Sequence, residues 1–178
     1  MKFKNRHNIA HNIGDRIVWE SRSVAVVGVI FIMKGNMGYV LVSRRGPKAA
    51  DFQGKMNLIA GYLDWDETGT DAVIRETWEE TGFNIKDAIK KYKTLNLNLY
   101  EPWAVSTNIN ENRQNISLRY GLVFELKENE DFPILTTKHN EIDGESEDPM
   151  WLPLSDIDKY EWAFRHNYVI NSYILKLI

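Results

Sequence analysis

The chain has 178 residues, 43% hydrophobic and 26% charged, which is enough to bury a core as one globular domain. Its formal net charge of −3 argues against a general basic surface for nucleic acids. Because cysteine is absent, disulfides, cysteine-ligated zinc and a cysteine nucleophile are excluded. No apolar run is long enough to span a membrane, and residues 1–22 carry too many charges for a signal peptide. We therefore expect a cytoplasmic protein.

Two strands are predicted early in the chain. Ser23 to Met33 is almost continuously apolar and rich in Val and Ile, which is typical of a central strand covered on both faces. A glycine-containing turn follows, and Tyr39 to Ser43 returns as a second strand. Arg44 and Arg45 come directly after it. Guanidinium groups bind phosphate oxygens well, so substrate contact and a solvated surface are both open interpretations of these arginines.

A strand, an acidic loop and a short helix come next. The strand is expected at Met56 to Leu63, and the helix at about Thr70 to Thr81. Thr70 or Thr68 can cap the start of the helix, and a glycine stands just past its end. A step of 100° per residue separates a side that can be buried from a charged side, which holds Arg75, Glu76, Glu79 and Glu80.

Three glutamates of this helix, Glu76, Glu79 and Glu80, stand at positions i, i+3 and i+4. Their carboxylates are therefore expected to converge on one patch, to repel one another and to raise one another's pKa values. A helix that gathers three carboxylates with one arginine favours binding of a cation. The alternative is a solvated acidic face, which such runs usually are.

The spacing in this region is more specific than its charge. Five residues separate Gly61 from Glu67, and seven more lead to Arg75-Glu76, Glu79-Glu80 and Gly82-Phe83. This pattern resembles the Nudix box, Gx5Ex7REUxEExGU. Its one departure is Thr77, where the family prefers an aliphatic residue; a β-branched Thr packs much as Val does, but its hydroxyl needs a partner.

The resemblance implies an α/β fold, the Nudix α/β/α sandwich with a mixed β-sheet between helices. It extends over a single domain at residues 23–178. Residues 1–22 are expected to form an N-terminal segment that packs on this domain or leads into it.

The resemblance also implies a metal site and a reaction. Glu76, Glu79 and Glu80, with the backbone carbonyl of Ala60, would hold one to three Mg²⁺ ions, for which Mn²⁺ can substitute. Glu67 and Arg75 would pair and fix the loop against the helix. The implied activity is Mg²⁺-dependent hydrolysis of a nucleoside diphosphate linked to another moiety, X–P–P–Y, by attack of water on phosphorus. Glu76 or an acid from a later loop would take the proton from that water, and both alternatives stay open.

Two strands are predicted after the helix. Thr94 to Tyr100 and Asn115 to Leu126 alternate in polarity, and the turn-rich stretch Thr107 to Gln114 would join them as a hairpin. A closing amphipathic helix is expected at Glu161 to Ile178.

An acidic stretch, Glu125 to Asp148, precedes a predicted strand at Met150 to Leu154. In the family this region often supplies one further acid to the metal site, and Glu145 and Glu147 are the candidates here. A solvated loop is the alternative for each of them.

The substrate is left open by the sequence. Tyr100 resembles a tyrosine of diadenosine polyphosphate hydrolases and could stack on a base, but core packing is the competing interpretation for Tyr100 and for Trp103. We expect a small nucleotide or nucleotide-sugar substrate, such as ADP-ribose, NADH or a dinucleoside polyphosphate, and a homodimer is an open alternative. A non-catalytic Nudix-fold binding or regulatory domain is the second hypothesis, although such domains tend to lose box acids. Isopentenyl diphosphate isomerase chemistry would need the cysteine that this chain lacks.

Overall fold

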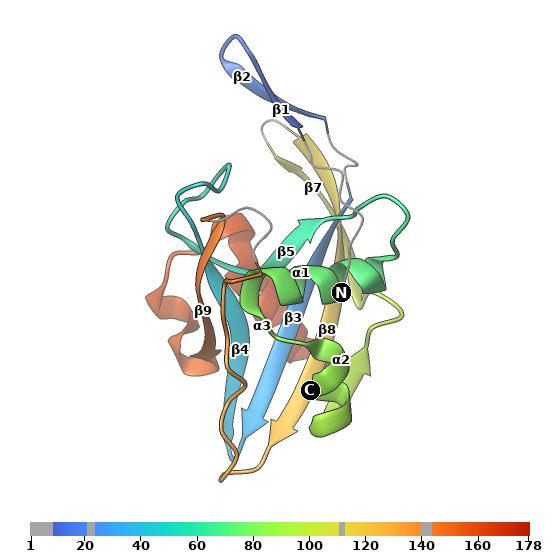
Figure 1. The fold of residues 1–178 in the computed structure, drawn as a ribbon, viewed down its shortest axis with the longest axis vertical. Coiled ribbons are helices and arrows are strands. Elements are labelled where there is room, and N and C mark those ends of the chain that lie inside the picture. Colours follow the sequence, from blue (N-terminus) through green and yellow to red (C-terminus); the bar gives the residue numbers. More distant parts are fainter. Residues whose placement is uncertain (1–8, 21–23, 111–112, 140–143) are drawn as a thin grey trace.

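The computed structural model describes residues 9–20, 24–110, 113–139 and 144–178 (Figure 1). Seven strands form its main sheet: β3 (Val24–Lys34), β4 (Met37–Arg45), β5 (Met56–Tyr62), β6 (Lys93–Asn98), β7 (Ala104–Asn110), β8 (Arg113–Leu126) and β9 (Ser146–Pro153). In space they follow the order β6-β8-β3-β5-β4-β9, and β7 also pairs with β8. Because β3 and β8 run parallel while the other pairs run antiparallel, the sheet is mixed.

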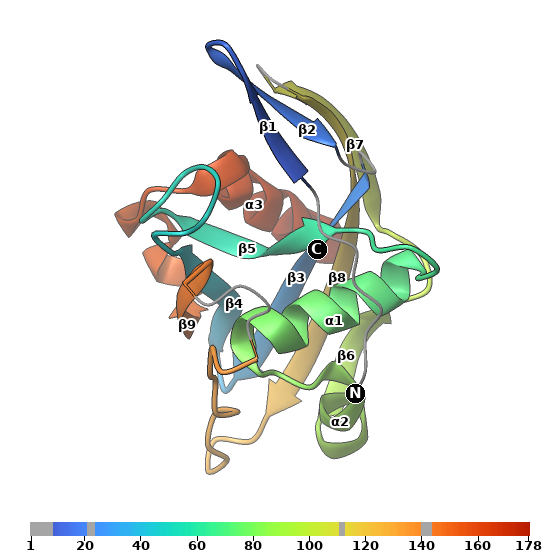
Figure 2. The ribbon, with the colours of Figure 1, turned by 45° about the horizontal axis from the view of Figure 1, so that its top comes forward.

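Helices cover both faces of this sheet, as Figures 1 and 2 show. α1 (Gly69–Thr81) and α2 (Ile85–Lys91) lie on one face, and α3 (His166–Leu177) lies on the other. Two 3₁₀ segments, η1 (Leu154–Lys159) and η2 (Ala163–Arg165), lead into α3. The predicted α/β/α sandwich is therefore confirmed. Within the described residues, no helix is both long and apolar enough to cross a membrane.

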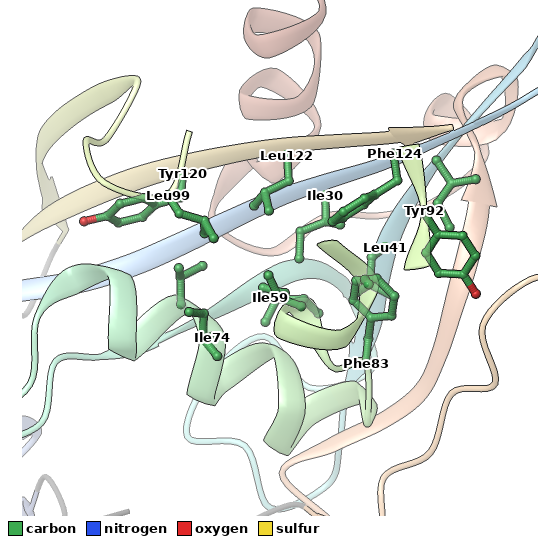
Figure 3. Packing of buried hydrophobic residues seen from close by; sticks show 14 of the residues in the cluster. Ile30, Leu41, Ile59, Ile74, Phe83, Tyr92, Leu99, Tyr120, Leu122 and Phe124 are labelled. Atoms are coloured by element: carbon green, nitrogen blue, oxygen red, sulfur yellow. The ribbon is translucent and has the colours of Figure 1, made fainter. Parts of the chain in front are cut away.

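β3 runs through the centre of the sheet and is covered on both sides, as its apolar sequence predicts. Its alternate side chains enter two separate hydrophobic clusters. The cluster beneath α1 and α2, shown in Figure 3, includes Val26, Ile30 and Ile32. The cluster beneath α3 includes Val27, Val29 and Phe31. The sheet thus has an α1 face and an α3 face, and both contribute to the sites described below.

α1 begins and ends as its sequence predicts. The Thr68 hydroxyl accepts a hydrogen bond from the Asp71 backbone N–H at 3.2 Å, and the Asp71 carboxylate accepts from the Thr68 backbone N–H at 3.3 Å, so the two residues form a capping box. Gly82 ends the helix in the left-handed region with φ 68°. Thr77, the departure from the family pattern, is fully buried and donates its hydroxyl to the Val73 carbonyl at 2.6 Å. Its hydroxyl has therefore found a partner.

The predicted hairpin between Thr94 and Leu126 is wrong in its connection. The stretch expected to be a turn, Thr107 to Gln114, lies largely in strands, because β7 pairs antiparallel with the first half of β8. β6 pairs with the second half of the same strand. Pro102, which has no N–H for a ladder, lies between β6 and β7, so two short strands cover one edge of β8.

The closing helix begins later than predicted, at His166 and not at Glu161. Phe164 and Arg165 have φ angles of 52° and 57°, which an α-helix does not contain, so the chain turns sharply before α3. The strand expected to start at Met150 instead begins at Ser146. These differences move boundaries but leave the order of elements unchanged.

A helix and a hairpin also have no counterpart among the predictions. Asn84 caps the start of α2, and its side chain accepts a hydrogen bond from the Asp87 backbone N–H. β1 (Ile9–Ile13) and β2 (Arg16–Glu20) form a separate two-stranded antiparallel hairpin at one end of the molecule (Figure 1). The division into a segment at 1–22 and a domain at 23–178 stays a prediction.

A buried histidine joins α3 to the sheet. His166 is 4% exposed, and its ring Nδ1 accepts a hydrogen bond from the Leu58 backbone N–H at 2.9 Å. Nδ1 must be unprotonated to accept this bond, so the ring is neutral. Burial, together with the positive charges of Arg119 and Arg45, lowers the pKa of His166 to about 3.

We expect the protein to lose stability as the pH falls from about 6.5 toward 3. Below pH 6.5 the unfolded chain takes up a proton at residue 166, while the folded ring stays neutral until the pH approaches its own pKa of about 3. This group alone should therefore lower the free energy of unfolding by about 1.4 kcal/mol per pH unit within that window. Chemical denaturation of the wild type and of His166→Asn, whose amide oxygen can replace Nδ1, measures the difference. Parallel pH profiles of the two proteins would contradict the assignment.

Candidate functional site

The side chain of Arg75 uses all five of its N–H groups. Nε and Nη2 donate to the two carboxylate oxygens of Glu67 at 3.1 and 2.8 Å, and Nη2 also donates to the Tyr62 carbonyl at 3.0 Å. Nη1 donates to Glu76 at 2.7 Å and to Glu79 at 3.0 Å. Because a guanidinium has five N–H donors, this set is complete. Burial would lower the pKa of Arg75, but the hydrogen bonds and charges of Glu67 and Glu76 outweigh it and raise that pKa.

This arginine fixes the acidic loop to α1. Glu67 also accepts a hydrogen bond from the Asp64 backbone N–H at 2.6 Å, and the Asp64 carboxylate lies 3.9 Å from Arg75 Nε. The predicted pairing of Glu67 with Arg75 is thus present as a bidentate ion pair with both side chains largely buried. Loop and helix are thereby held together by one cation.

Glu80 points away from this arginine. Its two carboxylate oxygens accept hydrogen bonds from the Ser43 hydroxyl at 3.1 Å and, more weakly, from the Ala60 backbone N–H at 3.4 Å. Ser43 is fully buried and also donates to Asn57. Burial and the neighbouring charge of Glu76 raise the pKa of Glu80 well above its usual range. The Glu80 carboxylate is therefore held against β4 and β5, next to the backbone of Ala60.

Glu76 lies against the start of the box. A Cβ on Gly61 would overlap the Glu76 carboxylate, so only glycine allows this approach. Burial raises the pKa of Glu76 to about 8, Arg75 opposes that rise, and the charges of Glu79 and Glu145 add to it. Burial is therefore the main reason that Glu76 holds a proton more tightly than an ordinary glutamate.

The donor set fits a hard divalent cation. Carboxylate and carbonyl oxygens are the ligands that Mg²⁺ prefers. Burial is the main cause of the raised pKa values of Glu76 and Glu80, neighbouring carboxylates add to it, and a bound cation would oppose both effects. Nevertheless, among the described residues no three acidic or histidine side chains already form a metal cage. Arg75 draws Glu76 and Glu79 to one side, whereas Glu80 turns to Ser43. The expected convergence of the three carboxylates is thus incomplete in this structure, and a metal would have to compete with these partners for them.

The late acidic loop reaches this site through Glu145. The backbone N–H groups of Gly46 and Lys48 donate to the carbonyls of Glu145 and Gly144 at 2.8 and 2.9 Å. A Cβ on Gly46 would overlap the Gly144 carbonyl, so the two segments lie in close contact. The charge of Glu145 acts on Glu76, whereas the other candidate, Glu147, lies in β9 opposite Arg44. The geometry favours Glu145 of the two.

The two arginines at the end of β4 differ in their surroundings. Arg45 donates to the Asp51 carbonyl and carboxylate at 2.7 and 2.9 Å, and its guanidinium lies 5.2 Å from the ring centre of Phe164. Its charge nevertheless reaches Glu80, whose pKa it lowers in part. Arg44 is more exposed and contacts Asp148 and the Gly54 carbonyl. Contact of either arginine with a substrate stays a prediction.

The two aromatic residues proposed for base stacking, Tyr100 and Trp103, differ in their exposure. Tyr100 is 87% exposed, so the expectation that it packs in the core is wrong. It follows β6 at the bend before Pro102, where the edge strand is interrupted. Trp103 is half-buried against the cluster beneath α3, so core packing is right for that residue. Base stacking by Tyr100 stays a prediction.

One residue of the site was missed by the sequence analysis. Ser43, which binds Glu80, ends the apolar run Val40-Leu41-Val42 of β4 and is fully buried. A polar residue inside an apolar strand is a signal that sequence reasoning could have used, because a buried hydroxyl requires a partner. The Tyr62 carbonyl, which accepts from Arg75, left no such signal because it is a backbone atom.

We expect Arg75→Met to cost roughly 3–5 kcal/mol of stability at neutral pH, because it leaves several buried carboxylates without their cation. Arg44→Met, which removes an exposed pair, should cost at most about 1 kcal/mol. Urea denaturation measures both. Hydrogen exchange should accelerate in residues 62–69 of the Arg75 variant more than in α1. Unchanged exchange in that loop would mean that the arginine does not hold it.

Comparison with known proteins shows the family and the fold of this chain. A sequence model of the NUDIX domain matches residues 22–173. No curated protein sequence matches the chain. Its structure resembles the NUDIX domain of Shewanella oneidensis NrtR complexed with ADP ribose, with a TM-score of 0.60 and 18% identity, over 87% of this chain and 88% of that one.

Two further solved structures show the same fold. The bifunctional NMN adenylyltransferase/ADP ribose pyrophosphatase of Francisella tularensis, complexed with AMP and a Mn ion, has a TM-score of 0.63 and 20% identity over 86% of this chain and 41% of that one. A C. elegans Ap4A hydrolase binary complex has a TM-score of 0.58 and 16% identity over 86% of this chain and 96% of that one. At these sequence identities, the comparison shows that the proteins share a fold. Since the family model spans most of the sequence, the chain belongs to the Nudix family.

Proposed function

We propose that this protein is a Mg²⁺-dependent pyrophosphohydrolase that cleaves a nucleoside diphosphate derivative, X–P–P–Y, by attack of water on phosphorus. The observation that carries the proposal is the arrangement of charge on α1. Glu76 and Glu80 are partly buried and have raised pKa values, and the arginine beside Glu76 is already saturated by hydrogen bonds. A complete set of box acids of this kind suits a cation and its anionic substrate.

Each box residue has a distinct part in this proposal. Glu76, Glu79 and Glu80, with the Ala60 carbonyl, would hold Mg²⁺, for which Mn²⁺ can substitute. The ion, when bound, would offset the charge of the diphosphate and make a bound water more acidic. Arg75 and Glu67 orient the carboxylates and the loop without contacting the reacting atoms. Ser43 and the Ala60 N–H orient Glu80.

Two groups are candidates for the base that accepts the proton of the attacking water. Glu76 lies within the proposed metal site, and its pKa of about 8 falls toward the ordinary value once a cation is bound beside it. Glu145 is exposed, and its charge reaches Glu76 from the late loop. An ionised carboxylate at the edge of the site can pass the proton on to solvent, which favours Glu145.

A binding or regulatory domain is the alternative function. The Shewanella protein in the comparison is an NrtR, and another of its structures is complexed with a 27mer DNA. We favour hydrolysis because every acidic position of the box is filled. ADP-ribose is a suitable first compound to assay, because it contains the X–P–P–Y group and is the ligand in that related structure.

We expect Glu80→Gln to reduce turnover by at least about a hundredfold with little change in folding, since the amide keeps the shape but loses the charge that a cation needs. The assay is release of products from ADP-ribose, NADH, diadenosine tetraphosphate and nucleoside triphosphates, with and without Mg²⁺. Glu128→Gln, at an exposed glutamate in the turn after β8, is the matched control. No Mg²⁺-dependent turnover of any compound by the wild type would favour the binding function. Near wild-type turnover by Glu80→Gln would remove that glutamate from the metal site.

We expect Glu145→Gln to lower kcat by about tenfold or more with a smaller effect on KM, because its carboxylate would act mainly in the transition state. Glu147→Gln, two residues further along in β9, should be nearly silent. Steady-state kinetics of the two variants and of the double variant decide between them. A fully active double variant would leave the α1 glutamates as the acids responsible for the chemistry.

A further inference from the structure

Three side chains on the α3 face of the sheet carry a buried polar atom that has no hydrogen-bond partner among the described residues. They are Trp103 (Nε1), Arg119 (Nε) and Tyr173 (hydroxyl), and we call them the donor cluster. Tyr173 is 1% exposed, so its hydroxyl cannot be satisfied by bulk water in this arrangement. Buried polar groups are hydrogen-bonded in the great majority of cases, and three such atoms in one region require an explanation.

The three residues are neighbours in the fold. The rings of Trp103 and Tyr173 have centres 5.1 Å apart, and the Trp103 backbone N–H donates to the Arg119 carbonyl at 2.8 Å. The hydroxyl end of Tyr173 lies directly over Gly121, where a Cβ would overlap it. Gly121 is two residues beyond Arg119 on the same strand, so the two positions share one face.

The strand register places this cluster beside the proposed metal site. Val27 of β3 pairs with Ala60 on one side and with Arg119 on the other. Adjacent strands lie about 4.8 Å apart, so Arg119 and Ala60 are separated by about 10 Å along one row of the sheet. The Ala60 side chain packs against the cluster beneath α3, while its backbone N–H bonds Glu80 from α1. The donor cluster is thus within the reach of a nucleotide whose diphosphate lies at Ala60.

The cluster carries positive charge without a described counterion. Arg119 has no ion pair among the described residues, and burial alone lowers its pKa. The charges of both Arg119 and Arg45 act on the nearby His166, which is neutral. Arg45 is paired with Asp51, so Arg119 is the cation whose charge is not offset.

The chemistry of the cluster defines its ligand. A guanidinium and an indole N–H only donate hydrogen bonds, and the tyrosine hydroxyl is able to donate as well. The ligand must therefore supply acceptors, and the charge of Arg119 favours acceptors that are negative. The simpler interpretation is that the head of Arg119 extends to water and that the tyrosine hydroxyl is merely unsatisfied. The two interpretations predict different behaviour of the variants below.

We propose that the donor cluster binds an anionic oxygen-bearing group of the substrate, a phosphate or a carboxylate, that lies apart from the diphosphate. This inference deepens the proposed hydrolase function, and its reference to a substrate rests on that function. The cluster would then select among X–P–P–Y compounds by their distal charge, whereas the α1 glutamates act on the diphosphate that all of them share.

The first test compares substrates that differ by one distal anion. NADPH and NADH differ by a phosphate, and UDP-glucuronate and UDP-glucose differ by a carboxylate in place of a hydroxymethyl group. For one of these pairs, we expect the wild type to favour the anionic member in kcat/KM by at least about tenfold, the effect of one charge-assisted hydrogen bond. Arg119→Gln should abolish this preference through KM and leave the neutral member unchanged, and Arg16→Gln on the exposed hairpin should preserve it. Absence of a preference in both pairs, or its persistence in Arg119→Gln, would overturn the proposal.

The second test does not depend on hydrolysis. Calorimetric titration of the metal-free protein with inorganic phosphate and with acetate measures binding to the cluster directly and separates the two kinds of anion. We expect one of them to bind the wild type and Arg16→Gln equally, and to bind Arg119→Gln at least about tenfold more weakly. Such binding in a protein that hydrolyses nothing would uphold the cluster and refute the hydrolase. If neither anion binds the wild type, the proposal fails even in an active hydrolase.

Tyr173→Phe separates a binding role from a structural one. The variant removes only the unsatisfied hydroxyl, so we expect the melting temperature to stay the same or rise. Anion binding should nevertheless weaken severalfold, because one donor is lost. Unchanged binding with a raised melting temperature would mean that the hydroxyl is only unsatisfied and would exclude Tyr173 from the site.

Discussion

The site depends on one saturated guanidinium. Arg75 has no hydrogen left to donate, and its five bonds join the end of β5, the acidic loop and two turns of α1. A lysine could not replace it, because an ammonium has three donors and cannot bind Glu67 in a planar, bidentate way. Because loop and helix share this cation, Glu76 and Glu79 are held beside Arg75, whereas Glu80 is held by Ser43 and the Ala60 N–H. A metal would therefore have to draw these carboxylates away from their present partners.

The path of β5 determines where those glutamates act. β5 enters between β3 and β4, so it pairs with the first half of β3 while β4 pairs with the second half. α1 packs tightly over this junction, where a Cβ on Gly28 would lie only 3.0 Å from the Val73 side chain. The short separation allows Glu80 to reach both Ser43 and the Ala60 N–H. Packing of an apolar helix face on the sheet thus sets the position of the charged face.

Local sequence determined what could be predicted, and long-range contacts determined what could not. The caps of α1 and the spacing of its glutamates lie within one continuous segment, so the sequence revealed them correctly. The edge strand β7 depends on pairing with β8, and its polar residues resembled a turn. The late start of α3 depends on the left-handed conformation of Phe164, a residue type that rarely adopts it. The saturation of Arg75 and the incomplete convergence of the carboxylates are matters of side-chain geometry, which spacing alone does not determine.

The charged groups near Ala60 of β5 differ between the two faces of the sheet. On the α1 face the glutamates outnumber their single cation, whereas on the α3 face Arg119 has no described counterion. Ala60 contacts groups on both faces, because its backbone N–H donates to Glu80 and its side chain packs against the cluster beneath α3. A substrate that crosses this strand would place its diphosphate near the α1 glutamates on one face. Its remaining part would lie near the donor cluster on the other face. Residues of the α3 face can therefore change without disturbing the hydrogen bonds of Arg75, which is how one fold can retain a reaction while its substrate varies.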